Sequence, residues 1–273
     1  MSKVDRLGWT DGLAFKCQGV TVGVRTNNPK VLKRVKKVLP LESTLIDSPV
    51  VDHLFSLFIG VDAPPPNFRR HHLLYNGSVR LIRTMKDDEL FDTLESMLRL
   101  RVAEFTKRRV FIHAGVVAWK GKAIVIPGSS HSGKTTLVTE LIKAGATYYS
   151  DEYAVLDKNG LTYPYPKTLS IRENGNSRQT EYAVEKFGAK AGKKPLPIAL
   201  VVVTDYKRNG LWRPRVLTEG RGALEMLVHV VSARRQPKFA LSTLNQVASR
   251  ATVLKSKRGE AKQTAQAILQ MLS

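Results

Sequence analysis

Short runs in which apolar and polar residues alternate dominate the first third of the chain, and such alternation is typical of half-buried strands. They predict a strand pair within residues 13–25 and further strands at 52–59, 71–75 and 79–85. The dipeptide Asn76-Gly77 favours a tight hairpin between the last two strands. We therefore expect the three strands after residue 52 to be antiparallel.

Two segments of the same region have apolar residues at helical spacing. The first, 30–39, carries five lysine and arginine residues outside its apolar positions, and a solvated basic helix face is the simplest interpretation. The second begins at Asp87-Asp88, which suits a helix start, and its apolar stripe continues to Phe105. Strands followed by a long helix predict an α+β unit.

A new apolar run starts at Val110 without a proline or glycine linker before it. We place a domain boundary just ahead of this run. The sequence thus predicts a smaller α+β domain over 1–108, which we interpret as a substrate docking surface, and a second domain over 109–273.

The second domain opens with a pattern of strand, Lys120-Gly121 turn and strand, which predicts a β-hairpin. A helix is expected over 134–144, closed by Gly145 in a left-handed cap. Strands and helices then alternate irregularly, which favours a mixed α/β domain. The remaining predicted strands are 147–149, 153–156, 168–171 and 198–203, and the remaining predicted helices are 222–231, part of 241–253 and 260–272.

Composition limits the class of protein that this chain can be, but it does not identify a partner. The chain has 273 residues, 42% of them hydrophobic, and no apolar run reaches the roughly 18 residues of a membrane span. The N-terminus lacks the apolar region of a secretion signal and Cys17 is the single cysteine, so we expect a cytoplasmic protein without disulfides. The net charge of +21 indicates an anionic partner, which nucleic acid, an acidic protein or peptide, or a nucleotide would satisfy.

The run from Gly128 to Thr135 has the spacing of a P-loop, and it stands between the predicted hairpin and the predicted helix. Glycines let successive backbone N–H groups face phosphate oxygens at a helix N-terminus. Lys134 would reach the β and γ phosphates, and the hydroxyl of Thr135 would hold Mg²⁺. We therefore expect ATP and Mg²⁺ as ligands. The expected nucleotide-binding residues are Gly128, Ser129, Ser130, His131, Ser132, Gly133, Lys134, Thr135 and Thr136.

Two acidic positions compete for the next role, which is to hold magnesium or to activate the attacking group. Asp205 ends the most apolar strand of the chain, as the second acidic motif of ordinary P-loop hydrolases does. The pair Asp151-Glu152 follows Lys134 after only one helix and one short strand. One carboxylate of such a pair can act as general base while the other holds the metal. The spacing alone leaves both alternatives open.

His113, in the strand that precedes the loop, gains interest from this context, although a lone histidine in an apolar strand is more often part of the core. The other histidines show no metal-ligand spacing.

At this point the residues resemble a known family. The order of His113-Ala-Gly, hairpin, P-loop, Tyr149-Ser-Asp151-Glu152 and the later segment ending in Arg172 is similar to the catalytic domain of HPr kinase/phosphorylase. It is more similar still to the HPr kinase-like serine kinases that are found near peptide-modification genes. The resemblance covers about residues 108–272. It implies a phosphoenolpyruvate carboxykinase-like nucleotide-binding domain with a mixed sheet.

The same resemblance implies catalytic roles for Asp151 as the base toward the substrate serine, and for His113, Lys134 and Arg172. The sequence departs from the family where Ser170 replaces a metal-binding glutamate and Glu173-Asn174 replaces a glycine region. Glu152 is therefore our candidate, with Thr135, for the metal site. The departures also weaken the expectation of phosphorylase activity.

Three hypotheses follow from these residues. The favoured one is an ATP-dependent kinase that phosphorylates a serine or similar hydroxyl of a protein, peptide or small molecule. The second is a nucleotide-binding switch associated with nucleic acid, which the lack of RNA-binding signatures disfavours. The third is an ordinary hydrolase that uses Asp205. A homo-oligomer is compatible with all three, and no membrane association is expected. Further basic groups that could close on a triphosphate are the 190–194 loop, Arg234, Arg235 and Arg258.

Overall fold

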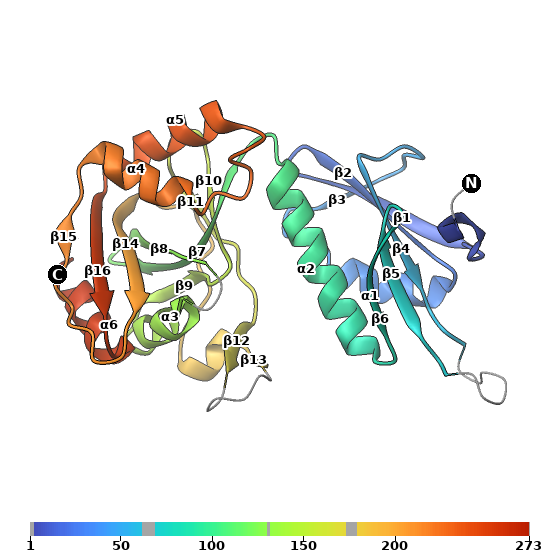
Figure 1. Ribbon diagram of the computed structural model, residues 1–273, viewed down its shortest axis with the longest axis horizontal. Coiled ribbons are helices and arrows are strands. Elements are labelled where there is room, and N and C mark those ends of the chain that lie inside the picture. The colour runs from blue at the N-terminus through green and yellow to red at the C-terminus, as the bar shows by residue number, and fades with distance from the viewer. Residues whose placement is uncertain (1–2, 62–68, 130–131, 173–178, 273) are drawn as a thin grey trace. The chain divides into compact units, whose positions relative to one another are not determined.

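The computed structural model describes residues 3–61, 69–129, 132–172 and 179–272, and its contacts divide the chain into two compact units, Met1–Arg108 and Arg109–Ser273. Both are mixed α/β structures, and the described residues form six α-helices (Figure 1). No helix in these described ranges has both the length and the apolar character needed to span a membrane.

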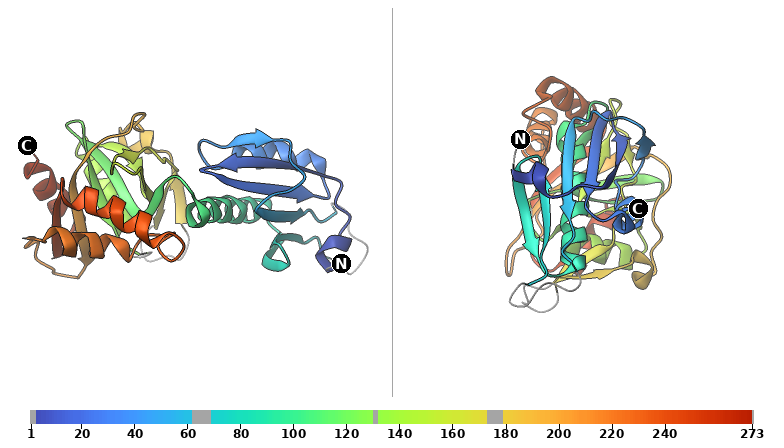
Figure 2. Two further views of the ribbon diagram at one scale, coloured as in Figure 1. Left: turned by 90° about the horizontal axis from the view of Figure 1, so that it is seen from above. Right: turned by 90° about the vertical axis from the view of Figure 1, so that its right-hand side faces the viewer.

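Unit 1 contains a six-stranded sheet with α2 packed against its last two strands (Figure 2). The strands pair in the order β3 (Thr44–Ile46), β1 (Asp11–Cys17), β2 (Val20–Thr26), β4 (His53–Phe58), β5 (His72–Asn76) and β6 (Val79–Thr84). The helices are α1 (Leu32–Lys37) and α2 (Asp87–Phe105), with 3₁₀ turns at Lys3–Arg6 and Pro29–Val31.

The sheet of unit 1 is mixed. The expected antiparallel arrangement of the strands within 52–85 is confirmed, since β5 pairs antiparallel with both β4 and β6. β2 and β4 pair in parallel, with Val22 opposite His53 and Thr26 opposite Leu57. The segment between them contains α1 and crosses from one end of the sheet to the other, as a parallel connection requires. Alternation of apolar and polar residues predicts a half-buried strand, but it does not predict whether the neighbouring strands are parallel or antiparallel.

Unit 2 is built on a larger mixed sheet with helices on both faces (Figure 1). Its strands pair in the order β11 (Thr162–Tyr163), β10 (Tyr153–Leu156), β7 (Val110–Trp119), β8 (Lys122–Pro127), β14 (Ile198–Tyr206), β16 (Thr252–Arg258) and β15 (Arg215–Val216), and β9 (Thr147–Ser150) also pairs with β7. A separate pair is formed by β12 (Leu169–Arg172) and β13 (Gln179–Tyr182). The helices are α3 (Lys134–Lys143), α4 (Glu219–Leu227), α5 (Pro237–Ala248) and α6 (Ala261–Gln270), with a 3₁₀ turn at Val184–Phe187.

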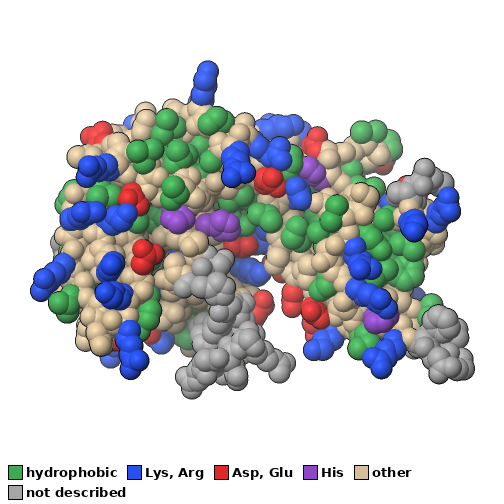
Figure 3. Space-filling view, viewed as in Figure 1, with side chains coloured by type: hydrophobic (Ala, Val, Ile, Leu, Met, Phe, Trp, Pro, Cys, Tyr) green, Lys and Arg blue, Asp and Glu red, His purple; other side chains and the backbone are tan. Residues whose placement is uncertain are grey.

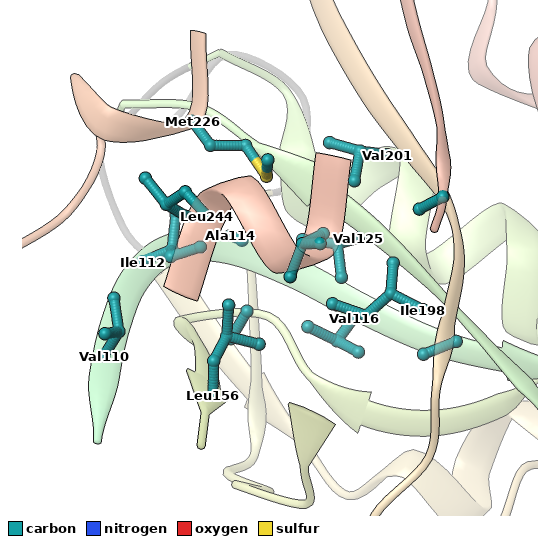
Figure 4. Packing of buried hydrophobic residues seen from close by; sticks show 14 of the residues in the cluster. Val110, Ile112, Ala114, Val116, Val125, Leu156, Ile198, Val201, Met226 and Leu244 are labelled. Carbon is teal, nitrogen blue, oxygen red and sulfur yellow. The ribbon is translucent and has the colours of Figure 1, made fainter. Parts of the chain in front are cut away.

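Alternate residues of the central strands enter two separate cores. Val201 and Val203 of β14 join the cluster under α4 and α5, whereas Leu200 and Val202 join the cluster under α3 and α6. Figure 4 shows the first cluster, in which Met226 and Leu244 pack against β7 and its neighbours. A sheet covered on both faces explains why β14 is a nearly continuous apolar run.

The parallel strands β8, β14 and β16 end at the same edge of this sheet. The P-loop follows β8 there, and the ends of β14 and β16 lie beside it. The prediction of a helix in part of 241–253 is confirmed by α5, which ends at Ala248 before β16 begins at Thr252. The predicted 222–231 helix is displaced, since α4 spans Glu219–Leu227.

Candidate active site

The P-loop is held between the end of β8 and the first turn of α3. The N–H of Gly128 donates to the carbonyl of His113 (3.0 Å), and Gly133 adopts a left-handed φ of 81° immediately before α3. A β-carbon on the buried Gly128 would lie only 2.6 Å from Oγ of Ser132. These two positions therefore require glycine for different reasons, one for close contact and one for backbone conformation.

Two side chains of the loop have polar groups placed for an anion. Nζ of Lys134 donates to the carbonyl of Ser129 (2.7 Å), so the lysine side chain lies across the P-loop. Burial lowers the pKa of Lys134, and the nearby Asp151 carboxylate partly opposes that shift. Oγ of Ser132 is buried and has no hydrogen-bond partner among the described residues. Ser130 and His131 lie outside the described residues.

Asp151 directly follows β9 and contacts the first turn of α3. Its carboxylate accepts from Oγ1 of Thr135 (3.3 Å) and from Oη of Tyr148 (2.9 Å). Burial raises the pKa of Asp151, and the two hydroxyl contacts lower it by less. A carboxylate with a raised pKa beside a P-loop hydroxyl is suited to accept a proton near neutral pH.

His113 and Glu152 lie near each other where β7 pairs with β10, since the N–H of Ala114 donates to the carbonyl of Glu152 (3.2 Å). His113 is opposite Tyr153 in the pairing of β7 with β10, and the two rings are 4.9 Å apart. Burial lowers the pKa of His113, Lys134 lowers it further, and Glu152 acts in the opposite direction. Lys134 and Glu152 thus act on the His113 ring in opposite directions, and the lowered pKa favours its neutral form.

No sequence pattern selects His229, yet the structure places it beside His113. The N–H of His113 donates to the carbonyl of His229 (2.9 Å), and the neighbouring Ile112 and Val230 form an antiparallel bridge. Burial lowers the pKa of His229, and Lys134 and His113 add to the shift. The contact arises because the chain after α4 pairs with β7, and no local sequence pattern reports such a pairing.

Asp205 belongs to a different part of the site. It is exposed, and β14 continues one residue beyond it to Tyr206. β14 flanks β8 on the side opposite β7, whereas Asp151 follows β9, which pairs with β7. The two aspartates that compete in the sequence thus lie on opposite flanks of the P-loop strand.

Arg258 is one of the basic groups that the sequence suggests could close on a triphosphate. Glu260 does precede α6, but Arg258 is the last residue of β16 and is 2% exposed. Its Nη2 donates to the carbonyl of Gly133 (2.8 Å) and its Nη1 to the carbonyl of Gly259 (3.1 Å). A buried guanidinium therefore contacts the P-loop.

The other predicted basic groups are less informative. The 190–194 loop is hydrogen-bonded to β9, since the N–H of Tyr148 donates to Lys190 and that of Gly192 donates to Tyr148. Arg234 is exposed. Arg172 lies in β12 opposite Gln179, and Ser170 lies opposite Glu181. The Glu173-Asn174 departure lies outside the described residues.

The donor set fits a magnesium nucleoside triphosphate. The glycine at Gly128, the unpartnered hydroxyl of Ser132 and the lysine of the loop are suited to phosphate, while Thr135 and Asp151 bring oxygen atoms together that are suited to a metal. Among the described residues, no group of three or more His, Cys, Asp and Glu side chains could hold a metal. Magnesium commonly takes most of its ligands from phosphate and water. No protein-family model matches the sequence, and no curated protein matches it either.

Proposed function

We propose that this protein is an ATP-dependent kinase that transfers the γ-phosphoryl group to a serine or similar hydroxyl. The observation that carries the proposal is the contact between Asp151 and Thr135, because it brings a half-buried carboxylate to the hydroxyl expected at the metal. The hairpin that leads into the P-loop and the acidic pair after α3 support a fold of the HPr kinase and phosphoenolpyruvate carboxykinase kind.

In the proposed reaction Asp151 takes the proton from the acceptor hydroxyl. The hydroxyl oxygen bonds to the γ-phosphorus as the bond from that phosphorus to the β–γ bridging oxygen breaks, and ADP leaves. Lys134 and the loop amides hold the β and γ phosphates, and neutral His113 stands beside them. Thr135 and Glu152 would hold Mg²⁺, which neutralises phosphate charge when bound.

The distribution of basic side chains bears on the nucleic-acid hypothesis. On the described part of the face in Figure 3, lysine and arginine side chains are spread over both units and form no continuous stripe. A clustered patch or stripe is the usual footprint of a nucleic-acid-binding domain. The view therefore favours a role for the charge in attracting a small anion or an acidic acceptor.

The test is transfer from γ-labelled ATP to a pool of serine-containing peptides by the full chain. We expect labelled peptide with the wild type, and loss of transfer without loss of ATP binding in Asp151→Asn. Lys134→Ala should lose both. Asp205→Asn serves as the matched control and should retain transfer. Release of inorganic phosphate alone, dependent on Asp205 and not on Asp151, would instead identify an ordinary hydrolase.

A further inference from the structure

Tyr206 is unusual among the aromatic residues of this protein. Its side chain is 51% exposed, and no other Phe, Tyr or Trp within the described ranges belongs to the exposed class. It is also the last residue of β14, at the edge of the sheet where the P-loop lies. An exposed aromatic ring at a phosphate site calls for an explanation, since such rings commonly serve as contact surfaces.

The β-carbon of Tyr206 is close to the start of α3. A β-carbon on Gly133 would lie 3.7 Å from Cβ of Tyr206. Side chains alternate along β14, so Tyr206 shares the sheet face of Leu200 and Val202, which pack in the cluster that includes α3. Tyr206 therefore stands on the α3 face of the sheet, next to the last glycine of the P-loop.

The direction of a bound triphosphate follows from the two flanks of β8. Asp151 contacts Thr135 from the flank of β7 and β9, so the reacting γ end belongs on that flank. The nucleoside is at the opposite end of the triphosphate. It would extend toward β14 and β16, where Tyr206 is located.

Arg258 contacts both the side chain of Tyr206 and the P-loop. It is the pairing partner of Tyr206 between β16 and β14, and its Cζ lies 5.5 Å from the ring centroid. Its Nη2 bonds to the Gly133 carbonyl, and its buried Nε has no partner among the described residues. Such a cation is costly to bury unless an anion compensates it, and a polyphosphate in the adjacent loop would do so.

We infer that Tyr206 is the stacking platform for the nucleobase of the phosphoryl donor, and that Arg258 positions it against the P-loop. This inference rests on the proposed function, and adds the subsite that distinguishes a nucleotide from a simple polyphosphate. Stacking uses the face of a base and not its hydrogen-bonding edge. The donor site should therefore accept adenine and guanine alike.

The experiment measures dissociation constants by calorimetry on the full chain for magnesium complexes of ATP, GTP and inorganic triphosphate. Tyr206→Ala should weaken ATP and GTP binding by about five- to 150-fold, because stacking of a base on an aromatic ring is worth about 1–3 kcal/mol, and should leave triphosphate binding within about twofold. Tyr206→Phe should bind like the wild type. Leu224→Ala is the control, because Leu224 is a similarly exposed apolar residue on α4.

Several outcomes overturn the inference. Equal weakening of ATP and triphosphate in Tyr206→Ala would show that the ring only supports the loop, and unchanged ATP binding would show that it has no role. A preference of a hundredfold or more for one base would show hydrogen-bonded readout elsewhere. If the wild type binds neither ATP nor triphosphate, the proposed function fails and this inference with it. If the wild type binds both equally, only the inference fails.

Discussion

Gly115 lies in β7 where α3 packs against that strand, and this contact sets the position of the P-loop helix relative to the hairpin. A β-carbon on Gly115 would lie 2.4 Å from Cγ2 of the fully buried Val138. Ordinary contacts between carbon atoms are about 3.5–4.0 Å, so Gly115→Ala must displace α3 or strain Val138. Overpacking of this kind costs about 1–3 kcal/mol.

We expect Gly115→Ala to lower the melting temperature of unit 2 by about 4–8 °C, taking about 2 kcal/mol and the slope for a domain of this size. Val138→Ala alone should cost about 2 kcal/mol, because it leaves a cavity. In the double variant the new methyl group occupies that cavity. The combined loss should therefore be about 2 kcal/mol in place of the additive value of about 4 kcal/mol.

Calorimetric unfolding of the full chain measures these four proteins. The control is Gly121→Ala in the hairpin turn, where φ is 77° and no atom lies within 4 Å of the new carbon. Its loss of about 1 kcal/mol has a backbone origin, so Val138→Ala should not relieve it. Additive losses for Gly115→Ala and Val138→Ala would refute the packing argument.

Three further predictions concern backbone strain and titration. Gly145→Ala should cost about 1 kcal/mol, visible as a fall of about 2–4 °C in the melting temperature, since φ is 100° there. The pKa of Asp151 is raised in the folded state, so its ionisation lowers the stability of the protein as the pH rises above the unfolded pKa of 3.8. Asp151→Asn should therefore have a higher melting temperature than the wild type at pH 7.5. This difference in melting temperature should vanish below pH 3.8. The pKa values of His113 and His229 are lowered, so stability should fall as pH drops below 6.5, and His113→Gln with His229→Gln should flatten that dependence in urea titrations. Equal pH profiles for variant and wild type would contradict either titration argument.

Local sequence signals were sufficient for the entry into the P-loop. The Lys120-Gly121 turn, the helix from Lys134 and the left-handed cap at Gly145 are all present in the structure. Each of them depends on residues close together in the chain. The glycine conformations follow from sterics, and the helix follows from apolar spacing.

The flank of the P-loop formed by β14 and β16 could not be predicted, because it depends on pairing between strands that are far apart in the sequence. β16 contains three basic residues within seven, and such a segment does not resemble a buried strand. It becomes one because β14, more than forty residues earlier, offers a parallel edge. Arg258 reaches Gly133 only through that pairing, and His229 reaches His113 only through the bridge after α4. The same limit explains why the parallel pairing of β2 and β4 was not foreseen.

Asp151 and Asp205 lie on opposite flanks of the P-loop strand, so the two aspartates need not compete for the same catalytic role. A general base works best when its pKa approaches the operating pH, and burial moves the pKa of Asp151 in that direction. Asp205 is exposed, and its strand neighbour Tyr206 presents an apolar ring at the same edge. If the γ end of the triphosphate lies toward Asp151, the β14 flank is left for the nucleoside. The opposite orientation would place the exposed ring of Tyr206 beside the reacting phosphate and the half-buried carboxylate of Asp151 beside the nucleobase. In those positions the ring could not stack on the nucleobase and the carboxylate could not accept the proton of the acceptor hydroxyl.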